Sequence, residues 1–315
     1  MGAVVRARNI KKRYGTVDAL AGLEMEIPGG EVFGLFGPNA SGKTTAIRIL
    51  HGITRPDGGE AEVAGVDVLA DPVGVRAVSA AMIENPPQFA QMRLCDYLRF
   101  HARMANVARK DESRRVYEAI SEVGLDEEAF RQVGELSLGQ KQRAELARLF
   151  LSDARVLLLD EPFSNIDTET RRAMKDRLRR WLGADRCVLY TSHYLLESEG
   201  LVDHFAFIRD GRIIAHGTQE ELRGKYLVPR FRLATTDPRR AMTVLERLSD
   251  VETAVLSSGG LEFQLKGQQP DSVLYALMNA GVPVQEMRRL GSVEEIFDSV
   301  MKLETAGGED DGPKG

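Results

Sequence analysis

One stretch decides the fold class of this chain: Gly37-Pro38-Asn39-Ala40-Ser41-Gly42-Lys43-Thr44. It agrees with the phosphate-loop pattern G-x-x-x-x-G-K-[ST] at every fixed position. An apolar run over residues 32–36 precedes it, and a helical run over residues 46–50 follows it. Such a loop turns backbone N–H groups toward an anion, and the following helix adds the positive end of its dipole. The pattern predicts a site for a nucleoside triphosphate. An ordinary glycine turn is the alternative, and the rest of the chain must decide between them.

Length and composition limit the possible classes. The chain has 315 residues, which predicts two domains or one large domain with an appendage. Hydrophobic residues make up 43%, and the formal net charge is -5. This charge does not favour binding to nucleic acid or to an anionic membrane, so no nucleic-acid partner is expected. Cys95 and Cys187 lie far apart, and we interpret them as buried or free thiols of a reducing compartment.

The chain contains no segment typical of membrane insertion. The N-terminus has no long apolar run and no cleavage site, and no stretch approaches the roughly 18 apolar residues of a transmembrane helix. We therefore expect a soluble chain that another polypeptide would bring to any membrane.

The order of the predicted elements indicates an α/β fold. Residues 156–159 are purely apolar, as in a strand that is buried on both faces of a parallel sheet. Asp210 and Gly211 form a hairpin signal. Other predicted strands cover residues 3–28 (broken by turns), 60–63, 65–68, 187–190 and 205–208, and predicted helices cover 93–120, 139–152 and 168–182.

The composition changes near Leu227-Val228-Pro229. Beyond it the pattern predicts the order β-α-β-β-α-β, which is that of a small ferredoxin-like domain. A final helix opens with a capping box from Ser292 to Glu295. The tail from Thr305 is rich in Gly and Asp and is expected to be disordered.

Two carboxylates follow the buried strand. Asp160 at its end can support Mg²⁺, and Glu161 next to it can polarise an attacking water. Taken alone, they would be better interpreted as a charged strand end at a loop. Together with a phosphate loop they favour an ATPase.

Four further motifs agree with one family. Leu136-Ser137-Leu138-Gly139-Gln140 precedes a basic helix start, and a helix N-terminus with Ser and Gly can bind an anion. With Ser164-Asn165-Ile166-Asp167, Thr191-Ser192-His193 and Tyr14, the chain resembles the ATP-binding cassette (ABC) family of ATPases. The resemblance covers roughly residues 3–225 and includes six motifs in order. Tyr14 alone would be an unremarkable surface tyrosine.

The resemblance implies a domain layout. It predicts an ABC ATPase domain over residues 1–225, with an antiparallel β subdomain and a helical subdomain at about 88–152. An accessory α+β domain would span 226–304, and a disordered tail 305–315. The accessory domain would be regulatory or would stabilise a dimer, and we favour the second.

The resemblance also assigns site residues. Glu161 would be the general base, His193 would sense the γ-phosphate, and Asp167 would lie in the loop that crosses to a second subunit. Tyr14 would stack on adenine, and Mg²⁺ would be held by Thr44, Asp160 and Glu84. Glu84 would also be catalytic, through contact with the attacking water. ATP would be bound by Tyr14, Gly37, Pro38, Asn39, Ala40, Ser41, Gly42, Lys43, Thr44 and Thr45. The signature residues Ser137, Leu138, Gly139 and Gln140 would act in trans.

The sequence departs from the family pattern at three positions. Leu138 stands at the first glycine position of the usual L-S-G-G-Q signature. Ala40 stands where most members have glycine, and would cost about 1 kcal/mol if its φ is positive. Glu84 stands where most members have glutamine. This resembles the glutamate-loop variant found in exporters of bacitracin-like and lantibiotic peptides. The alternative is a tolerated substitution without meaning for the substrate.

The function implied is that of an ATP-hydrolysing exporter subunit. It would use ATP and Mg²⁺ to drive efflux of an antibiotic, peptide or other amphipathic substrate through a separate integral-membrane permease. A second ABC ATPase subunit, in a homodimer, would complete the site. The chain would be cytoplasmic and peripheral on the inner face of the membrane. The alternative is a non-transport ABC ATPase or an ATP-dependent regulatory module. The single phosphate loop and the intact Glu161 and His193 speak against it.

Overall fold

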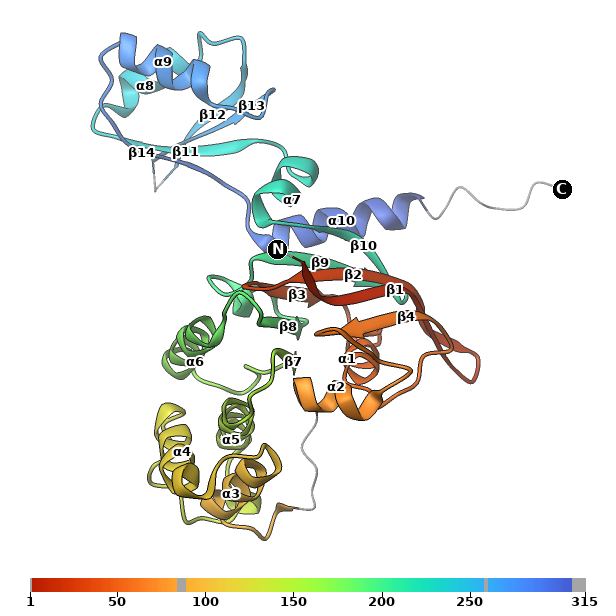
Figure 1. The fold of residues 1–315 in the computed structure, drawn as a ribbon. Coiled ribbons are helices and arrows are strands. Elements are labelled where there is room, and N and C mark those ends of the chain that lie inside the picture. The colour runs from red at the N-terminus through yellow and green to blue at the C-terminus, as the bar shows by residue number, and fades with distance from the viewer. Residues whose placement is uncertain (1, 84–88, 258–259, 308–315) are drawn as a thin grey trace, which may run out of the picture. The chain divides into compact units, whose positions relative to one another are not determined.

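The computed structural model describes residues 2–83, 89–257 and 260–307 (Figure 1). The chain forms two compact units, Met1–His216 and Gly217–Gly315. Glu84 and most of the tail predicted from Thr305 lie outside the described residues.

The first unit is built on a six-stranded sheet in the order β10-β9-β3-β8-β7-β6. The strands β6, β7, β8, β3 and β9 are parallel neighbours. The residues of β3, β8 and β6 are buried throughout, and those of β7 up to its last residue, as expected for a parallel sheet covered on both faces. The strand bounds are β3 (Val32–Phe36), β6 (Ser79–Met82), β7 (Val156–Asp160), β8 (Cys187–Ser192), β9 (His204–Arg209) and β10 (Arg212–Gly217).

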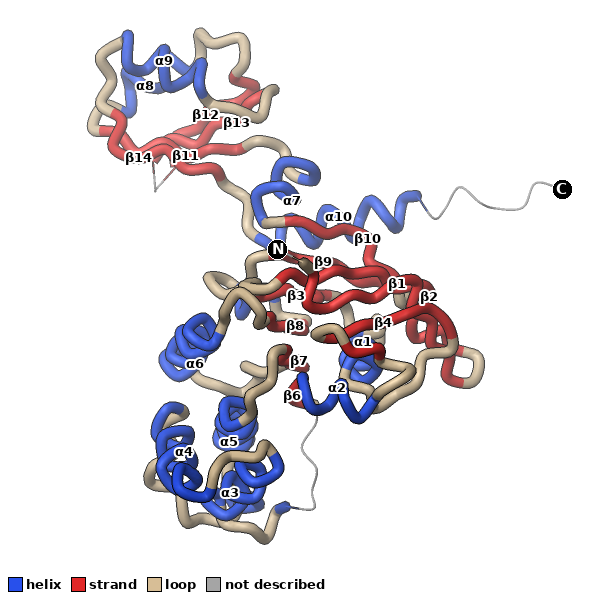
Figure 2. Tube along the Cα trace, in the orientation of Figure 1, coloured by secondary structure: helices blue, strands red, loops and turns tan. Residues whose placement is uncertain are grey.

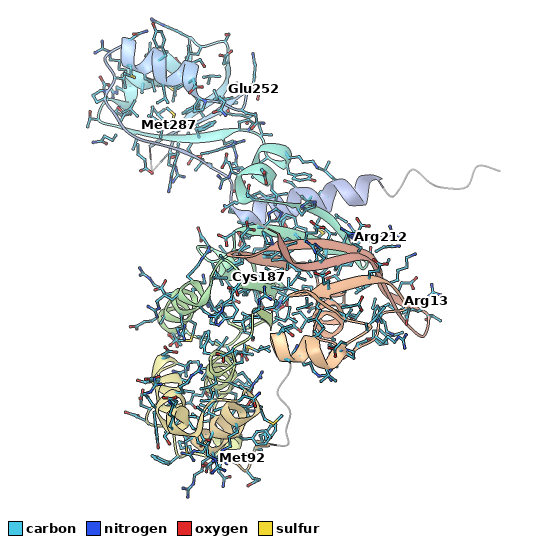
Figure 3. All side chains as sticks on the ribbon, in the orientation of Figure 1. Arg13, Met92, Cys187, Arg212, Glu252 and Met287 are labelled. Atoms are coloured by element: carbon cyan, nitrogen blue, oxygen red, sulfur yellow. The ribbon has the colours of Figure 1, made fainter. Side chains whose placement is uncertain are left out.

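The predicted hairpin turn is confirmed. Asp210 and Gly211 join β9 to β10 with φ of 48° and 73°, the positive pair that a two-residue hairpin of this type requires. Cys187 lies inside the first unit (Figure 3), and both it and Cys95 are buried and free, as predicted.

A second sheet in this unit has the order β2-β1-β4-β5. It comprises β1 (Ala3–Tyr14), β2 (Val17–Pro28), β4 (Gly58–Val63) and β5 (Val66–Asp67), all antiparallel. Its buried residues share one hydrophobic core with α1 (Lys43–Leu50) and the six-stranded sheet, with Ile10, Leu20 and Ile47 among the most buried side chains. This shared core holds the start of α1 in place. Other helices in this unit are α2 (Pro72–Val78) and α6 (Thr168–Trp181), with a short turn η3 (Leu195–Ser198).

The helical part contains α3 (Leu94–Met104), α4 (Arg109–Glu122), η2 (Val133–Glu135) and α5 (Leu138–Leu151) (Figure 2). The helices α3, α4 and α5 pack against one another around apolar residues such as Leu98, Val116 and Leu146. The single helical run predicted over residues 93–120 is wrong, because α3 ends at Met104 and α4 begins at Arg109. Asn106 breaks the run with a positive φ of 58°, a conformation that Asn adopts more readily than most residues.

The second unit carries a four-stranded antiparallel sheet in the order β12-β13-β11-β14. Phe231, Leu233, Phe263 and Leu277 form part of its core. The element order β-α-β-β-α-β is the predicted one. The elements are α7 (Gln219–Tyr226), β11 (Arg230–Thr235), α8 (Pro238–Leu245), β12 (Val251–Ser257), β13 (Gly260–Leu265), α9 (Asp271–Asn279), β14 (Val284–Arg289) and α10 (Val293–Gly307).

The boundary between the units falls earlier than residue 225. The helix α7 packs on α10 and belongs to the second unit by its contacts. The functional domain limits stay a prediction. No helix in the described part of the chain combines the length and apolar character that crossing a bilayer requires.

Candidate nucleotide site

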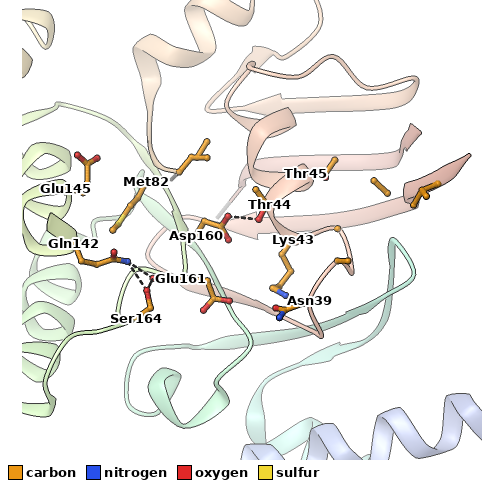
Figure 4. A pocket seen from close by; sticks show the side chains of 15 residues that line it. Asn39, Lys43, Thr44, Thr45, Met82, Gln142, Glu145, Asp160, Glu161 and Ser164 are labelled. Carbon is orange, nitrogen blue, oxygen red and sulfur yellow. Dashed lines mark hydrogen bonds between the residues drawn. The ribbon is translucent and has the colours of Figure 1, made fainter. Parts of the chain in front are cut away.

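A cavity of about 510 Å³ lies where β3, β6 and β7 end (Figure 4). The carboxyl edge of parallel strands is the usual place for a ligand in such sheets. Predicted residues from distant parts of the chain meet there. Those that line the cavity are Asn39, Ala40, Gly42, Lys43, Thr44, Thr45, Asp160 and Glu161.

The phosphate loop has the form of an anion cradle. Gly42 has a φ of 110°, and a Cβ there would lie 2.5 Å from the Ala19 carbonyl oxygen, so a side chain does not fit. Ser41 is buried, and its Oγ has no hydrogen-bond partner within the described part of the chain. A buried hydroxyl without a partner in this loop fits an oxygen-rich phosphate.

Lys43 is held inside the loop. Its Nζ donates to the carbonyl oxygens of Gly37 (2.7 Å) and Pro38 (2.9 Å). Burial lowers the pKa of this amine, while Glu161 and Asp160 oppose the shift. Because an ammonium in a low-dielectric site attracts anions strongly, Lys43 fits the role of a phosphate-binding cation.

Asp160 is oriented by two threonines. Thr44 Oγ1 donates to Asp160 Oδ2 at 2.6 Å, and Thr191 Oγ1 donates to Asp160 Oδ1 at 2.5 Å. This brings a hydroxyl and a carboxylate together at the start of α1. Such a pair of oxygens fits Mg²⁺, which takes few protein ligands and completes its shell with phosphate and water.

Glu161 has an unusual backbone and a well-bonded carboxylate. Its φ is 49°, which non-glycine residues rarely adopt. Oε2 accepts from Ser192 Oγ (3.0 Å), while Oε1 accepts from His193 N (3.0 Å) and lies 2.7 Å from His193 Nδ1. The structure thus brings Glu161 and His193 together. Glu161 lines the cavity, and His193 is not among the described residues that line it.

Ala40 has a φ of 64°, in the left-handed region. The condition under which alanine would cost strain at this position is therefore met.

The signature residues form a capped helix start away from the cavity wall. Ser137 is the N-cap of α5, its Oγ accepts from Gln140 N (3.2 Å), and Gln140 Oε1 accepts from Ser137 N (2.9 Å). Leu138 is 65% exposed. Gly139 lies so close to the Asn165 carbonyl that a Cβ would come within 2.4 Å of its oxygen. These residues are not among the described residues that line the cavity.

Tyr14 and Asp167 also lie outside the described cavity lining. Tyr14 is 48% exposed at the end of β1, and its strand partner Val17 lines the cavity. Asp167 caps α6 by accepting from Thr170 N (2.9 Å).

Sequence reasoning missed several residues that shape the site. Thr191 and Ser192 hold the two carboxylates, and Gln142 lines the cavity and donates to the Glu161 carbonyl (2.7 Å). The position of Thr191 and Ser192 directly before His193, at the end of an apolar strand, was an available signal. The spacing of Gln142 from the signature residues gave no such signal by itself.

The fold and the cavity define a phosphate-loop nucleotide-binding protein. Comparison with known proteins narrows this class. Residues 20–164 match the family model described as ABC transporter. A Nod factor export ATP-binding protein I from Burkholderia orbicola is 35% identical over 229 residues, covering 70% of this chain and 72% of the relative. The Daunorubicin resistance ATP-binding protein DrrA2 from Streptomyces coeruleorubidus is 32% identical over 303 residues, 94% of both chains.

A solved structure described as the ATP binding subunit of an ABC transporter has the same fold. It has a TM-score of 0.65 at 23% identity and covers 71% of this chain and 93% of its own. The chain belongs to the ATP-binding proteins of the ABC transporter family, which bind and hydrolyse ATP.

Proposed function

We propose that this chain is the ATP-hydrolysing subunit of an exporter, which drives an antibiotic, peptide or other amphipathic substrate through a separate permease. The observation that carries the proposal is the placement of Lys43, Thr44, Asp160 and Glu161 around one cavity. These four side chains supply a phosphate-binding cation, two oxygens for Mg²⁺ and a carboxylate for an attacking water.

The reaction is the transfer of the γ-phosphoryl group to water. Glu161 accepts a proton from the attacking water while the water oxygen forms a bond to the γ-phosphorus. The bond between this phosphorus and the β,γ-bridging oxygen breaks, which gives ADP and phosphate. Thr44 and Asp160 would hold Mg²⁺, which neutralises charge on the phosphates when bound. Lys43 would exchange its bonds to Gly37 and Pro38 for phosphate oxygens. His193, which contacts the Glu161 carboxylate, would support Glu161 and sense the γ-phosphate.

A second subunit would complete the site. Ser137, Leu138, Gly139 and Gln140 stand at a helix N-terminus, where a hydroxyl and the helix dipole favour an anion. They do not line the described cavity, and Leu138 is exposed. Their proposed ligand is the ATP held by the phosphate loop of a partner subunit. Asp167 would contact the partner, and Tyr14 would stack on adenine.

The relatives support export as the direction of transport. One is named for export of Nod factor and another for resistance to daunorubicin. Because the match to the second covers 94% of this chain, it includes most of the second unit. This favours an amphipathic antibiotic or drug as the substrate. The proposed location is the cytoplasmic face of the membrane beside the permease, and the proposed role of the second unit is to stabilise the dimer.

The experiment is to purify the chain with and without a co-expressed permease and to measure ATP turnover. We expect the permease to change the rate and an amphipathic drug to stimulate it. Glu161→Gln should reduce turnover about 10²- to 10⁴-fold, the range for loss of a general base, while ATP binding is retained.

Glu169→Gln is the matched control, since it makes the same change at an exposed position in the first turn of α6. Wild-type turnover in Glu161→Gln would remove this residue from the role of base. A chain that hydrolyses ATP but neither binds nor responds to any permease would contradict the transport function.

A further inference from the structure

The backbone of Glu161 is held from three sides. Its carbonyl oxygen accepts from Gln142 Nε2 at 2.7 Å, from Ser164 Oγ at 3.0 Å and from Ser164 N at 3.3 Å, and its N–H donates to the Thr191 carbonyl at 3.1 Å. Gln142 Nε2 also lies 3.3 Å from Ser164 Oγ, so the two donors contact each other (Figure 4).

This arrangement explains how Glu161 keeps a positive φ of 49°. A non-glycine residue in that conformation is strained, and it stays there only where its surroundings fix it. The backbone conformation sets the direction in which the carboxylate leaves the chain. Gln142 and Ser164 therefore help to determine where the proposed base points.

Gln142 comes from the helix that carries the signature. It lies on α5 one turn beyond Leu138, on the cavity wall. In the first turn of the same helix, Gly139 lies against the carbonyl of Asn165, another residue with a positive φ (61°). The start of α5 thus contacts the segment after β7 at two points, which are the carbonyls of Glu161 and Asn165.

We propose that Gln142 is a positioning residue that links the signature helix to the backbone of the catalytic base. When Ser137–Gln140 contact the nucleotide of a partner subunit, the displacement of α5 reaches Glu161 of the same chain through this bond. Binding at one site of a dimer then aligns the base at the other. The inference rests on the proposed function, in which Glu161 is the base and the signature acts in trans.

The test removes the donor and keeps the size of the side chain. Gln142→Met and Gln142→Glu both lack the N–H that reaches the Glu161 carbonyl. We expect kcat to fall about ten- to hundredfold in both, the scale of a small misplacement of a catalytic group, with the Kd for ATP within twofold of wild type. Ser164→Ala removes the hydroxyl donor but keeps the Ser164 N–H that also reaches this carbonyl, so it should give a smaller fall in kcat.

Lys141→Met is the matched control. Lys141 is the preceding residue of α5 and also donates from a side-chain nitrogen to a backbone carbonyl, that of Gly134 at 3.1 Å. A merely structural role for Gln142 predicts similar losses of thermal stability in the two residues' variants and no change in kcat.

A double variant tests whether Gln142 acts through Glu161. In a Glu161→Gln background, Gln142→Met should cause no further loss of the residual rate. A further tenfold loss there, or a wild-type kcat in both Gln142 variants while Glu161→Gln is inactive, would overturn this inference alone. Wild-type turnover in Glu161→Gln would instead overturn the proposed function.

Discussion

The two helix starts of the first unit that we propose as anion sites differ in how far the chain completes them. The start of α1 lies on a cavity wall. There the buried Lys43 donates a hydrogen bond to the Gly37 carbonyl of the loop, and the Thr44 hydroxyl donates one to the Asp160 carboxylate. The start of α5 has a capping box, Gln140 Nε2 also donates to Glu128 Oε1 at 2.8 Å, and Leu138 there is 65% exposed. One half-site is built from five distant segments of this chain. We propose that the other presents a formed helix end to the nucleotide of a second subunit.

Lys43→Met should disrupt the half-site at the phosphate loop, and we expect it to have the largest effect on ATP binding and turnover. Loss of a buried cation removes charged hydrogen bonds to phosphate worth roughly 1.5–3 kcal/mol each, so ATP affinity should fall about a hundredfold or more and turnover with it. Nucleotide titration checks this. Lys110→Met, an exposed lysine of α4, should bind ATP normally. Wild-type affinity in Lys43→Met would show that the cavity does not bind phosphates through this loop.

Ser137→Arg should disrupt only the proposed half-site at the start of α5. A bulky side chain at the N-cap blocks an approaching nucleotide, so turnover should fall about a hundredfold, or about 3 kcal/mol in activation free energy. The isolated subunit should still bind ATP within twofold of wild type, because Ser137 does not line the described cavity. The test is to compare titrations with steady-state rates.

The control for this variant is Thr218→Arg. Thr218 is the N-cap of α7 and also has a capping box, so its loss costs a similar cap of about 1 kcal/mol. If both variants lose turnover equally, the effect of Ser137→Arg comes from stability and not from the signature.

Acid should lower the free energy of unfolding through His51, at the end of the helix that follows the phosphate loop. Burial lowers the pKa of His51, the C-cap of α1, to about 4 from its usual 6.5, with Arg148 and Arg76 contributing. Between pH 6.5 and 4 the unfolded chain therefore binds a proton that the folded chain does not. The free energy of unfolding should fall over this range, by on the order of 2–3 kcal/mol at pH 4.

The variant His51→Gln should flatten this dependence. Its amide can replace the ring nitrogen that lies 2.9 Å from Ser79 Oγ without titrating. Denaturant unfolding of both proteins at several pH values from 7 to 4.5 gives the difference that belongs to His51. If the free energy of unfolding depends on pH in the same way in wild type and His51→Gln, His51 is not the group responsible.

Ala40→Gly should give the smallest effect. Glycine relieves the left-handed strain at φ 64° but also gains freedom in the unfolded chain, so the net stabilisation should be about 0.5 kcal/mol. Thermal unfolding measures it, with turnover no lower than wild type. A lower melting temperature would indicate that alanine is not strained there.

Local sequence patterns predicted the fold well where one segment carries the signal. The phosphate loop, the buried strand before Asp160 and the turn at Asp210-Gly211 are of this kind, because glycine and apolar periodicity act over a few residues. The break between α3 and α4 was not predictable, since Asn106 adopts its positive φ without any Gly or Pro beside it.

The site was harder to predict because its parts meet through tertiary contacts. The pattern indicated Glu161 and His193 as separate functional residues, but not that Ser192 and His193 bond the Glu161 carboxylate. Gln142 was missed for the same reason. Its contact with the Glu161 carbonyl depends on how α5 packs beside the end of β7.

The most direct test of two half-sites is the mass of the nucleotide-bound protein. Glu161→Gln should bind ATP without turnover and sediment as a dimer when ATP and Mg²⁺ are present, and as a monomer without them. The double variant Ser137→Arg, Glu161→Gln should bind the same amount of ATP per chain and remain a monomer. ATP-dependent dimers of the double variant, or monomers of Glu161→Gln saturated with ATP, would contradict a site completed by the signature of a second copy.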